Sequence, residues 1–118
     1  MELSRKADYA LRAMVELASS CKSHISAKEL AQLTQVPYAF MAKIVAELAS
    51  HGFVENQRGY GGGVKINADP ARVSVLQIIE AMDGPLKLNR CVIELKSCPR
   101  TSSCAVHEVL SVAQKQLV

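Results

Sequence analysis

Three of the four cysteines in this 118-residue chain lie close together near its C-terminal end. Cys91, Cys98 and Cys104 follow a C-x6-C-x5-C spacing, and His107 comes three residues after the last cysteine. Thiolate and imidazole groups are good ligands for iron and zinc. If a helix begins near residue 104, Cys104 and His107 lie on one face of it. The spacing therefore predicts a metal centre, either an iron–sulfur cluster or a tetrahedral zinc site.

The cysteine spacing leaves these alternatives open. Zinc sites usually contain a C-x2-C pair, which this segment lacks, so the spacing leans slightly towards an iron–sulfur cluster. A thiol-redox site without metal is a further alternative, since clustered thiols in a reducing compartment can respond to oxidation. No general acid, base or nucleophile accompanies the cysteines, so we do not expect an enzyme.

The composition indicates one modest globular domain. Hydrophobic residues make up 49% of the chain, which is enough for a core without disulfides. No apolar stretch has the length of a signal peptide or a membrane span, so we expect a cytoplasmic protein with no membrane partner. The net charge of +3 is compatible with nucleic acid without requiring it. Aromatic residues, at 4%, are too scarce for binding single strands by base stacking.

Apolar periodicity and capping residues predict two helices at the start of the chain. Ser4 can cap a helix over residues 3–20, in which apolar side chains recur at spacings of three and four. This predicted stripe contains Leu3, Ala7, Ala10, Leu11, Met14, Leu17 and Ala18. Ser26 and Glu29 form a capping box for a short second helix, which should end near Thr34.

A third helix and a hairpin follow. Pro37 lies in a turn and suits the first turn of a helix that should run to His51, where Gly52 can adopt a left-handed cap. Residues 53–58 and 64–67 read as two short strands joined by a glycine-rich turn. This order is typical of a winged helix-turn-helix, whose third helix enters the major groove while the hairpin contacts the backbone or minor groove.

The winged-helix arrangement predicts the residues that contact DNA. Small side chains on the third helix allow its backbone to approach base edges, and a lysine there can reach a phosphate or a guanine. Arg58 stands directly before the glycine-rich tip and is the best candidate for insertion into the minor groove. Taken singly, the alanines also suit an ordinary helix surface. The predicted set is Tyr38, Ala39, Ala42, Lys43, Arg58, Tyr60 and Gly61.

The remaining third of the chain completes a mainly α fold. Ser74 and Gln77 form a second capping box for a helix that Gly84 and Pro85 close. A last helix should begin near Ser103, with an apolar stripe suited to a second subunit. This stripe contains Val106, Val109, Leu110, Ala113 and Leu117. The predicted organisation is a winged helix-turn-helix domain at 1–84, a cluster-binding loop at 85–103 and a dimerisation helix at 104–118.

Residues 3–17, the Arg58–Gly63 segment and the three spaced cysteines together resemble the Rrf2 family of regulators, which includes the IscR and NsrR proteins. The resemblance implies a homodimer that crosses its last helices and reads a palindromic operator in double-stranded DNA. It also implies a 2Fe-2S or 4Fe-4S cluster between the DNA-binding unit and the dimer helix. The implied function is a repressor whose DNA affinity responds to iron–sulfur status, nitric oxide or redox state.

The resemblance offers two fourth ligands for the cluster. His107 matches family members in which three cysteines and one histidine hold a 2Fe-2S cluster. Asp8 matches the acidic residue that, in the nitric-oxide sensors, comes from the partner subunit to complete a 4Fe-4S cluster. This sequence retains both residues. Family members usually also have a longer dimer helix than the one predicted at 104–118.

Overall fold

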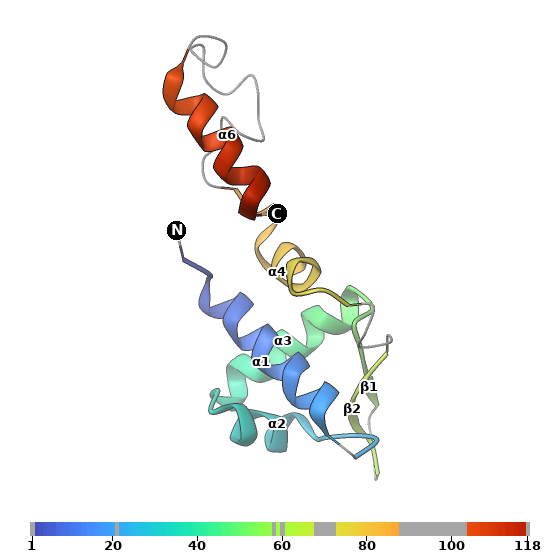
Figure 1. The fold of residues 1–118 in the computed structure, drawn as a ribbon. Helices are drawn as coiled ribbons and strands as arrows, with labels where there is room; N and C mark the ends of the chain where they lie inside the picture. The colour runs from blue at the N-terminus through green and yellow to red at the C-terminus, as the bar shows by residue number, and fades with distance from the viewer. Residues whose placement is uncertain are drawn as a thin grey trace. The chain divides into compact units, whose positions relative to one another are not determined.

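The computed structural model describes residues 2–20, 22–57, 59, 61–67, 73–87 and 104–117. Over these residues the chain forms five helices and one antiparallel hairpin (Figure 1). In chain order the elements are α1 (Arg5–Ser19), α2 (Ala27–Thr34), α3 (Tyr38–Ser50), β1 (Val54–Gln57), β2 (Gly63–Ile66), α4 (Val75–Asp83) and α6 (Ala105–Leu117). Three helices, a hairpin and further helices follow one another as predicted, and the mainly α, winged-helix fold class is confirmed.

The chain divides into two compact units, Glu2–Gly84 and Pro85–Val118. The first unit contains the three N-terminal helices, the hairpin and α4, whereas the second contains α6. Within the described ranges, no helix combines the length and the hydrophobicity needed to cross a bilayer.

Helix α1 supplies much of the core of the first unit. It contacts α2, α3, α4 and β2, and it buries Ala7, Ala10, Ala13, Met14 and Leu17. The predicted stripe was wrong at Leu3 and Ala18, which are exposed. Leu3 precedes the N-cap residue Ser4, so it lies outside α1 and cannot belong to the apolar stripe of that helix. The many alanines allow neighbouring helices to approach α1 closely, since a small side chain fills little space.

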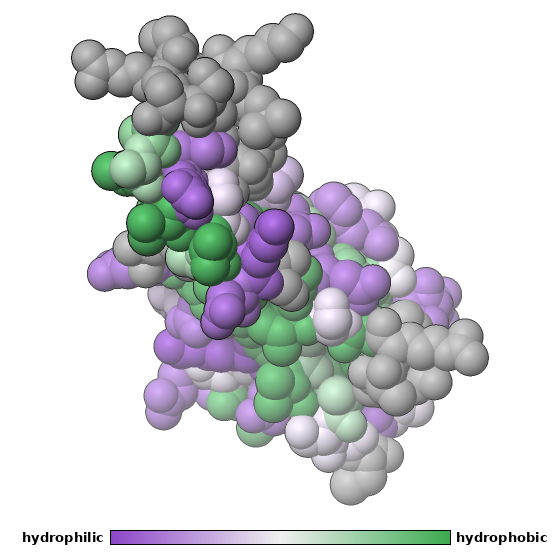
Figure 2. All heavy atoms as spheres, turned by 45° about the horizontal axis from the view of Figure 1, so that its top comes forward, coloured by the Kyte–Doolittle hydropathy of each residue, from purple (hydrophilic) through white to green (hydrophobic). Residues whose placement is uncertain are grey.

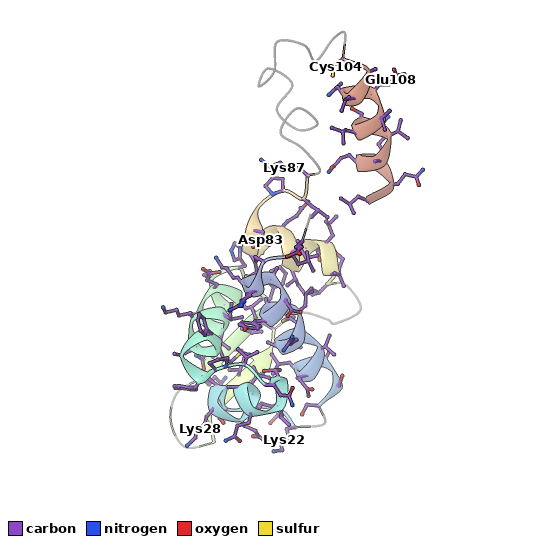
Figure 3. The ribbon with its side chains drawn as sticks, turned by 90° about the vertical axis from the view of Figure 1, so that its left-hand side faces the viewer. Lys22, Lys28, Asp83, Lys87, Cys104 and Glu108 are labelled. Carbon is purple, nitrogen blue, oxygen red and sulfur yellow. The ribbon has the colours of Figure 1, made fainter. Side chains whose placement is uncertain are left out.

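Side-chain caps define where the helices start. The Ser4 hydroxyl accepts a hydrogen bond from the Ala7 backbone N–H at 3.0 Å and donates one to the Asp83 carboxylate at 2.6 Å. This contact joins the start of α1 to the end of α4, where Figure 3 labels Asp83. Ser74 forms both halves of the predicted capping box with Gln77. At Ser26 the predicted box is only half present, because the hydroxyl accepts from the Glu29 N–H while the Glu29 carboxylate pairs with Lys22 at 2.6 Å.

The C-terminal end of α3 is a Schellman motif. Gly52 has a φ of 80°, as predicted for a left-handed cap, and its N–H donates to the Ala49 carbonyl at 3.0 Å. The Phe53 N–H donates to the Leu48 carbonyl at 3.0 Å. These bonds end the helix sharply and turn the chain into β1.

The hairpin is held against the helices by a two-residue β-bridge. Ile25, just before α2, exchanges backbone hydrogen bonds with Val64 of β2, at 2.9 and 2.7 Å. Both side chains are buried. A Cβ atom placed on neighbouring Gly63, whose φ is 147°, would lie 2.9 Å from the carbonyl carbon of Ile25. Glycine at position 63 therefore permits the close backbone approach that anchors the hairpin.

This close approach predicts that Gly63→Ala destabilises the protein more than Gly61→Ala. Both residues have positive φ, which costs an alanine about 1 to 2 kcal/mol, but only position 63 adds steric overlap with Ile25. Urea unfolding followed by circular dichroism measures the difference. Equal losses of unfolding free energy in the two variants would contradict a tight contact at Gly63.

Candidate nucleic-acid interface and ligand residues

The turn between α2 and α3 fixes the angle between the two helices. Gln35 adopts a left-handed conformation with φ 59°, which is uncommon for a residue other than glycine. The Val36 N–H donates to the Ala31 carbonyl at 3.0 Å, and the Val36 side chain is buried. Pro37 then opens α3, as predicted from its fixed φ. The turn is thus built by backbone bonds and one buried valine.

Helix α3 buries one face and exposes another. Met41, Ile44, Val45 and Leu48 face the core. Tyr38, Ala39 and Lys43 are exposed and Ala42 is half-buried. The residues predicted to contact DNA on this helix therefore lie mainly on its solvent side, where small side chains leave the helix backbone open to approach.

The hairpin tip is described only in part. Gly59 and Gly61 are exposed, and the Gly62 N–H donates to the Gly59 carbonyl at 3.0 Å. Arg58 and Tyr60, which we predict to contact DNA, lie outside the described residues. On the strands, Lys65 pairs with Glu55 across the hairpin at 3.4 Å.

Arg12 of α1 joins α1 to the end of α2 and contacts Tyr9, which reaches α3, a role that the sequence analysis missed. Its guanidinium donates to the Thr34 carbonyl at the end of α2 at 3.2 Å and pairs with the Asp8 carboxylate at 2.9 Å. It also lies 5.6 Å from the centre of the Tyr9 ring. Tyr9 in turn packs edge-on against Phe40 of α3, with ring centres 6.2 Å apart. In the sequence, the i, i+4 spacing of Asp8 and Arg12 on a predicted helix is the feature that could have indicated this ion pair.

The start of α6 carries the two described members of the predicted ligand set. Cys104 directly precedes the helix, and the Glu108 N–H donates to its carbonyl at 3.4 Å (Figure 3). The Nε2 atom of His107 lies 3.3 Å from the Ser111 hydroxyl. Its Nδ1 atom is buried, and no hydrogen-bond partner for it occurs within the described part of the chain.

The described residues contain half of the predicted cysteine–histidine set. Cys91 and Cys98 lie outside these residues, and no group of three metal-binding side chains gathers in the part that the structure describes. Asp8, the alternative fourth ligand, is engaged by Arg12, and its side chain is 47% exposed. A carboxylate at the surface is accessible to another subunit, but metal binding would compete with this ion pair.

Helix α6 exposes apolar side chains. Val106, Val109 and Val112 are at least 57% exposed, and none of the described residues of α6 is buried. Figure 2 shows apolar side chains on the surface of this segment, at the upper left. Gln114 donates a hydrogen bond to the Leu86 carbonyl, so the second half of α6 contacts the start of its own unit. Val106 and Val109 belong to the stripe predicted to pack on a second subunit, whereas Val112 does not.

Comparisons of sequence agree with the fold. The sequence profile of the Rrf2 family, described as an iron-dependent transcriptional regulator, matches residues 3–118. The HTH-type transcriptional repressor NsrR of Streptomyces coelicolor is 31% identical over 117 residues, which span 98% of this chain and 78% of that protein. The transcriptional regulator NsrR of Bacillus subtilis is 26% identical, over 96% of this chain and 79% of its own length.

Solved structures are also similar. The structure of CymR, the global cysteine regulator of B. subtilis, has a TM-score of 0.74 at 22% identity, covering 98% of this chain and 88% of CymR. At this identity the likeness concerns the fold alone. The structure of T. potens IscR has a TM-score of 0.66 at 26% identity, covering 99% of this chain and 87% of IscR.

The contacts of Arg12 predict that Arg12→Gln destabilises the helix-turn-helix. The variant loses a charged hydrogen bond to a backbone carbonyl and should lower the free energy of unfolding by roughly 1 to 3 kcal/mol. Asp8→Asn, the matched control, removes the exposed ion pair and the interaction of the carboxylate with the start of α1 but keeps the bond to Thr34, so it should cost less than about 1 kcal/mol. Urea titration of both variants gives the comparison, and an equal loss would assign the effect to the ion pair instead.

Proposed function

The chain belongs to the Rrf2 family of transcriptional regulators, and we propose that it is a repressor whose affinity for DNA is controlled by an iron–sulfur cluster. The observation that carries the DNA-binding part is the exposed face of α3 beside an anchored hairpin. The three thiols and the nearby imidazole are not needed for that part, so the two parts of the proposal can be tested separately.

In the proposed complex α3 enters the major groove and the hairpin tip contacts the adjacent backbone or minor groove. Ala39 and Ala42 allow the helix to approach base edges, while Lys43 reaches a phosphate or a guanine. Tyr38, at the first position of α3, can donate its hydroxyl to a phosphate. Arg58 inserts into the minor groove, and the backbone N–H groups near Tyr60 and Gly61 approach a phosphate.

The protein acts as a homodimer that binds a palindromic operator. The exposed valines of α6 support this proposal, because a helix with an uncovered apolar face is stabilised by packing against a partner. Two copies related by a two-fold axis present two α3 helices, and these read half-sites that the same symmetry relates. Crossing of the α6 helices would form the dimer contact.

Cys91, Cys98, Cys104 and His107 would hold the cluster. The buried Nδ1 atom of His107, without a described partner, supports this ligand set because a buried polar atom is usually bonded. Asp8 from a second copy is the competing fourth ligand, and it would first have to leave Arg12. The family resemblance implies a 2Fe-2S cluster with the histidine and a 4Fe-4S cluster with the aspartate. When bound, such a cluster supplies a centre that gains or loses electrons and reacts with small oxidants or nitric oxide.

The residues of this chain would convert a change at the cysteines into a change in DNA affinity. Cys104 stands directly before α6, so its position is tied to the start of the proposed dimer helix. The hydrogen bond from Gln114 to the Leu86 carbonyl ties the second half of α6 to the first residues of the same unit. A movement of the segment between Lys87 and Cys104 would thus alter how the two DNA-binding units of a dimer are spaced. This makes the cysteine segment a regulatory site for DNA binding.

The cluster part predicts the metal content of protein purified without oxygen. We expect about two iron and two sulfide per chain, and loss of the visible absorbance in Cys98→Ala and in His107→Ala. Asp8→Ala is the matched control and should keep its iron. About four iron per chain, lost in Asp8→Ala but retained in His107→Ala, would identify Asp8 rather than His107 as the fourth ligand of the cluster. Zinc alone, or colourless protein without metal, would contradict the cluster and favour the zinc or thiol-redox alternative.

The DNA part predicts that Arg58→Ala weakens binding to a duplex selected by the wild-type protein from a randomised library. The expected loss is about 1 to 3 kcal/mol for an arginine inserted in a groove. Fluorescence anisotropy measures the affinity, with Lys115→Ala of α6 as a control that also removes one positive charge. If the Arg58 variant and the control bind the duplex equally well, Arg58 does not contact the DNA.

A further inference from the structure

A groove of about 370 Å³ lies between the first half of α1 and the recognition helix α3. Three cationic side chains line it: Arg5 and Lys6 from α1, and Lys43 from α3. Glu47 is the one carboxylate among its described lining residues, so the groove carries a net charge of +2 (three cations less one anion). The net charge therefore favours an anionic occupant, while the mainly apolar surface of the groove favours one that also has apolar parts.

Aromatic and aliphatic groups form the rest of the groove. Ile44 is 5% exposed and supplies its floor, while Tyr9 is half-buried. Phe40 is 55% exposed, although it packs edge-on against Tyr9. A large exposed aromatic ring next to three cations suits a ligand that is both anionic and apolar. The sugar–phosphate backbone of DNA has this combination, since apolar deoxyribose alternates with charged phosphate.

The groove adjoins the face of α3 that is proposed to enter the major groove. Lys43 belongs to both, because it lines the groove and stands one residue after Ala42. Phosphate strands border the major groove, so a helix lying in it has a strand within reach of the side chains on its flank. We infer that one sugar–phosphate strand of the duplex lies in this groove, with Arg5 and Lys6 of α1 contacting its phosphates and Phe40 its sugars. This inference rests on the proposed DNA-binding function.

The ion pair in the groove is suited to exchange. Lys6 contacts Glu47 at 2.8 Å, and both side chains are 42% exposed. An ion pair with this exposure is weak in water, so a phosphate can replace the carboxylate as the partner of Lys6. The Glu47 carboxylate would then face the phosphate and repel it. Glu47 therefore limits affinity in the bound state, in contrast to the three cations.

The test measures binding of the full chain to the duplex selected from a randomised library, by anisotropy over a series of salt concentrations. Arg5→Gln should weaken binding roughly 3- to 10-fold near 0.1 M salt and reduce the slope of log K against log salt by about one. Glu47→Gln should strengthen binding several-fold, because repulsion is removed and Lys6 is released. Lys115→Gln makes the same charge change as Arg5→Gln but lies in the second unit, Pro85–Val118, and it should leave the affinity for DNA nearly unchanged.

A chemical probe on the DNA identifies the contacted phosphates. Neutral methylphosphonates placed singly along each strand should weaken wild-type binding at one or two positions beside the recognised half-site. At those positions Arg5→Gln should show little further loss, as expected when residue and phosphate form one contact. Equal sensitivity of the variant and the wild type at every position would overturn the inference.

The outcomes separate the inference from the function on which it rests. If the wild-type protein selects and binds no duplex, the proposed function fails. If it binds while Arg5→Gln matches Lys115→Gln and Glu47→Gln gives no increase, the groove does not hold the backbone. A shift of the sedimentation equilibrium of Arg5→Gln or Glu47→Gln towards monomer, without a change in intrinsic DNA affinity, would instead make the groove an interface between copies and overturn the inference.

Discussion

The two backbone hydrogen bonds between Ile25 and Val64 are the constraint on which the shape of the first unit depends. They attach the hairpin to the segment that leads into α2, so strand and helix-turn-helix keep a fixed relation. A hairpin of two short strands would be only marginally stable by itself. The bridge adds a third backbone segment and buries Ile25 and Val64 in the same core as α1. Together with the Schellman motif that leads from α3 into β1, this bridge fixes the position of the hairpin relative to α3.

Much of this unit could be predicted from local sequence. The caps at Ser4, Ser26 and Ser74 and the glycine at position 52 have local causes, since each satisfies backbone groups within a few residues. The error at Leu3 was also local, because periodicity does not mark the residue at which a helix begins. The burial of Val36 and the left-handed Gln35 were not predicted, since the tertiary packing of the turn overrides the ordinary preference of a glutamine.

The candidate sites were predictable to different degrees. The spacing of Cys104 and His107 predicted that both lie at the start of one helix, because residues three apart share a helix face. The cluster of Arg12, Thr34 and Tyr9 depends on α1 meeting α2, and a single sequence carries no record of that contact. Phe40 illustrates the same limit. Its exposure and its edge-on contact with Tyr9 depend on how α1 meets α3, which the sequence analysis did not address.

Helix α1 has a wider role than filling the core. On one side Arg12 bonds the last carbonyl of α2, and on another Lys6 pairs with Glu47 of α3. The end of α2 is therefore held by a polar side chain of α1 as well as by the apolar core, whereas the exposed Lys6–Glu47 pair adds little to the contact with α3. Polar contacts depend on geometry more strongly than apolar ones, because a hydrogen bond weakens steeply as its angle changes. A small displacement of α1 would therefore weaken the Arg12 contact with the end of α2 before it disturbed the apolar core.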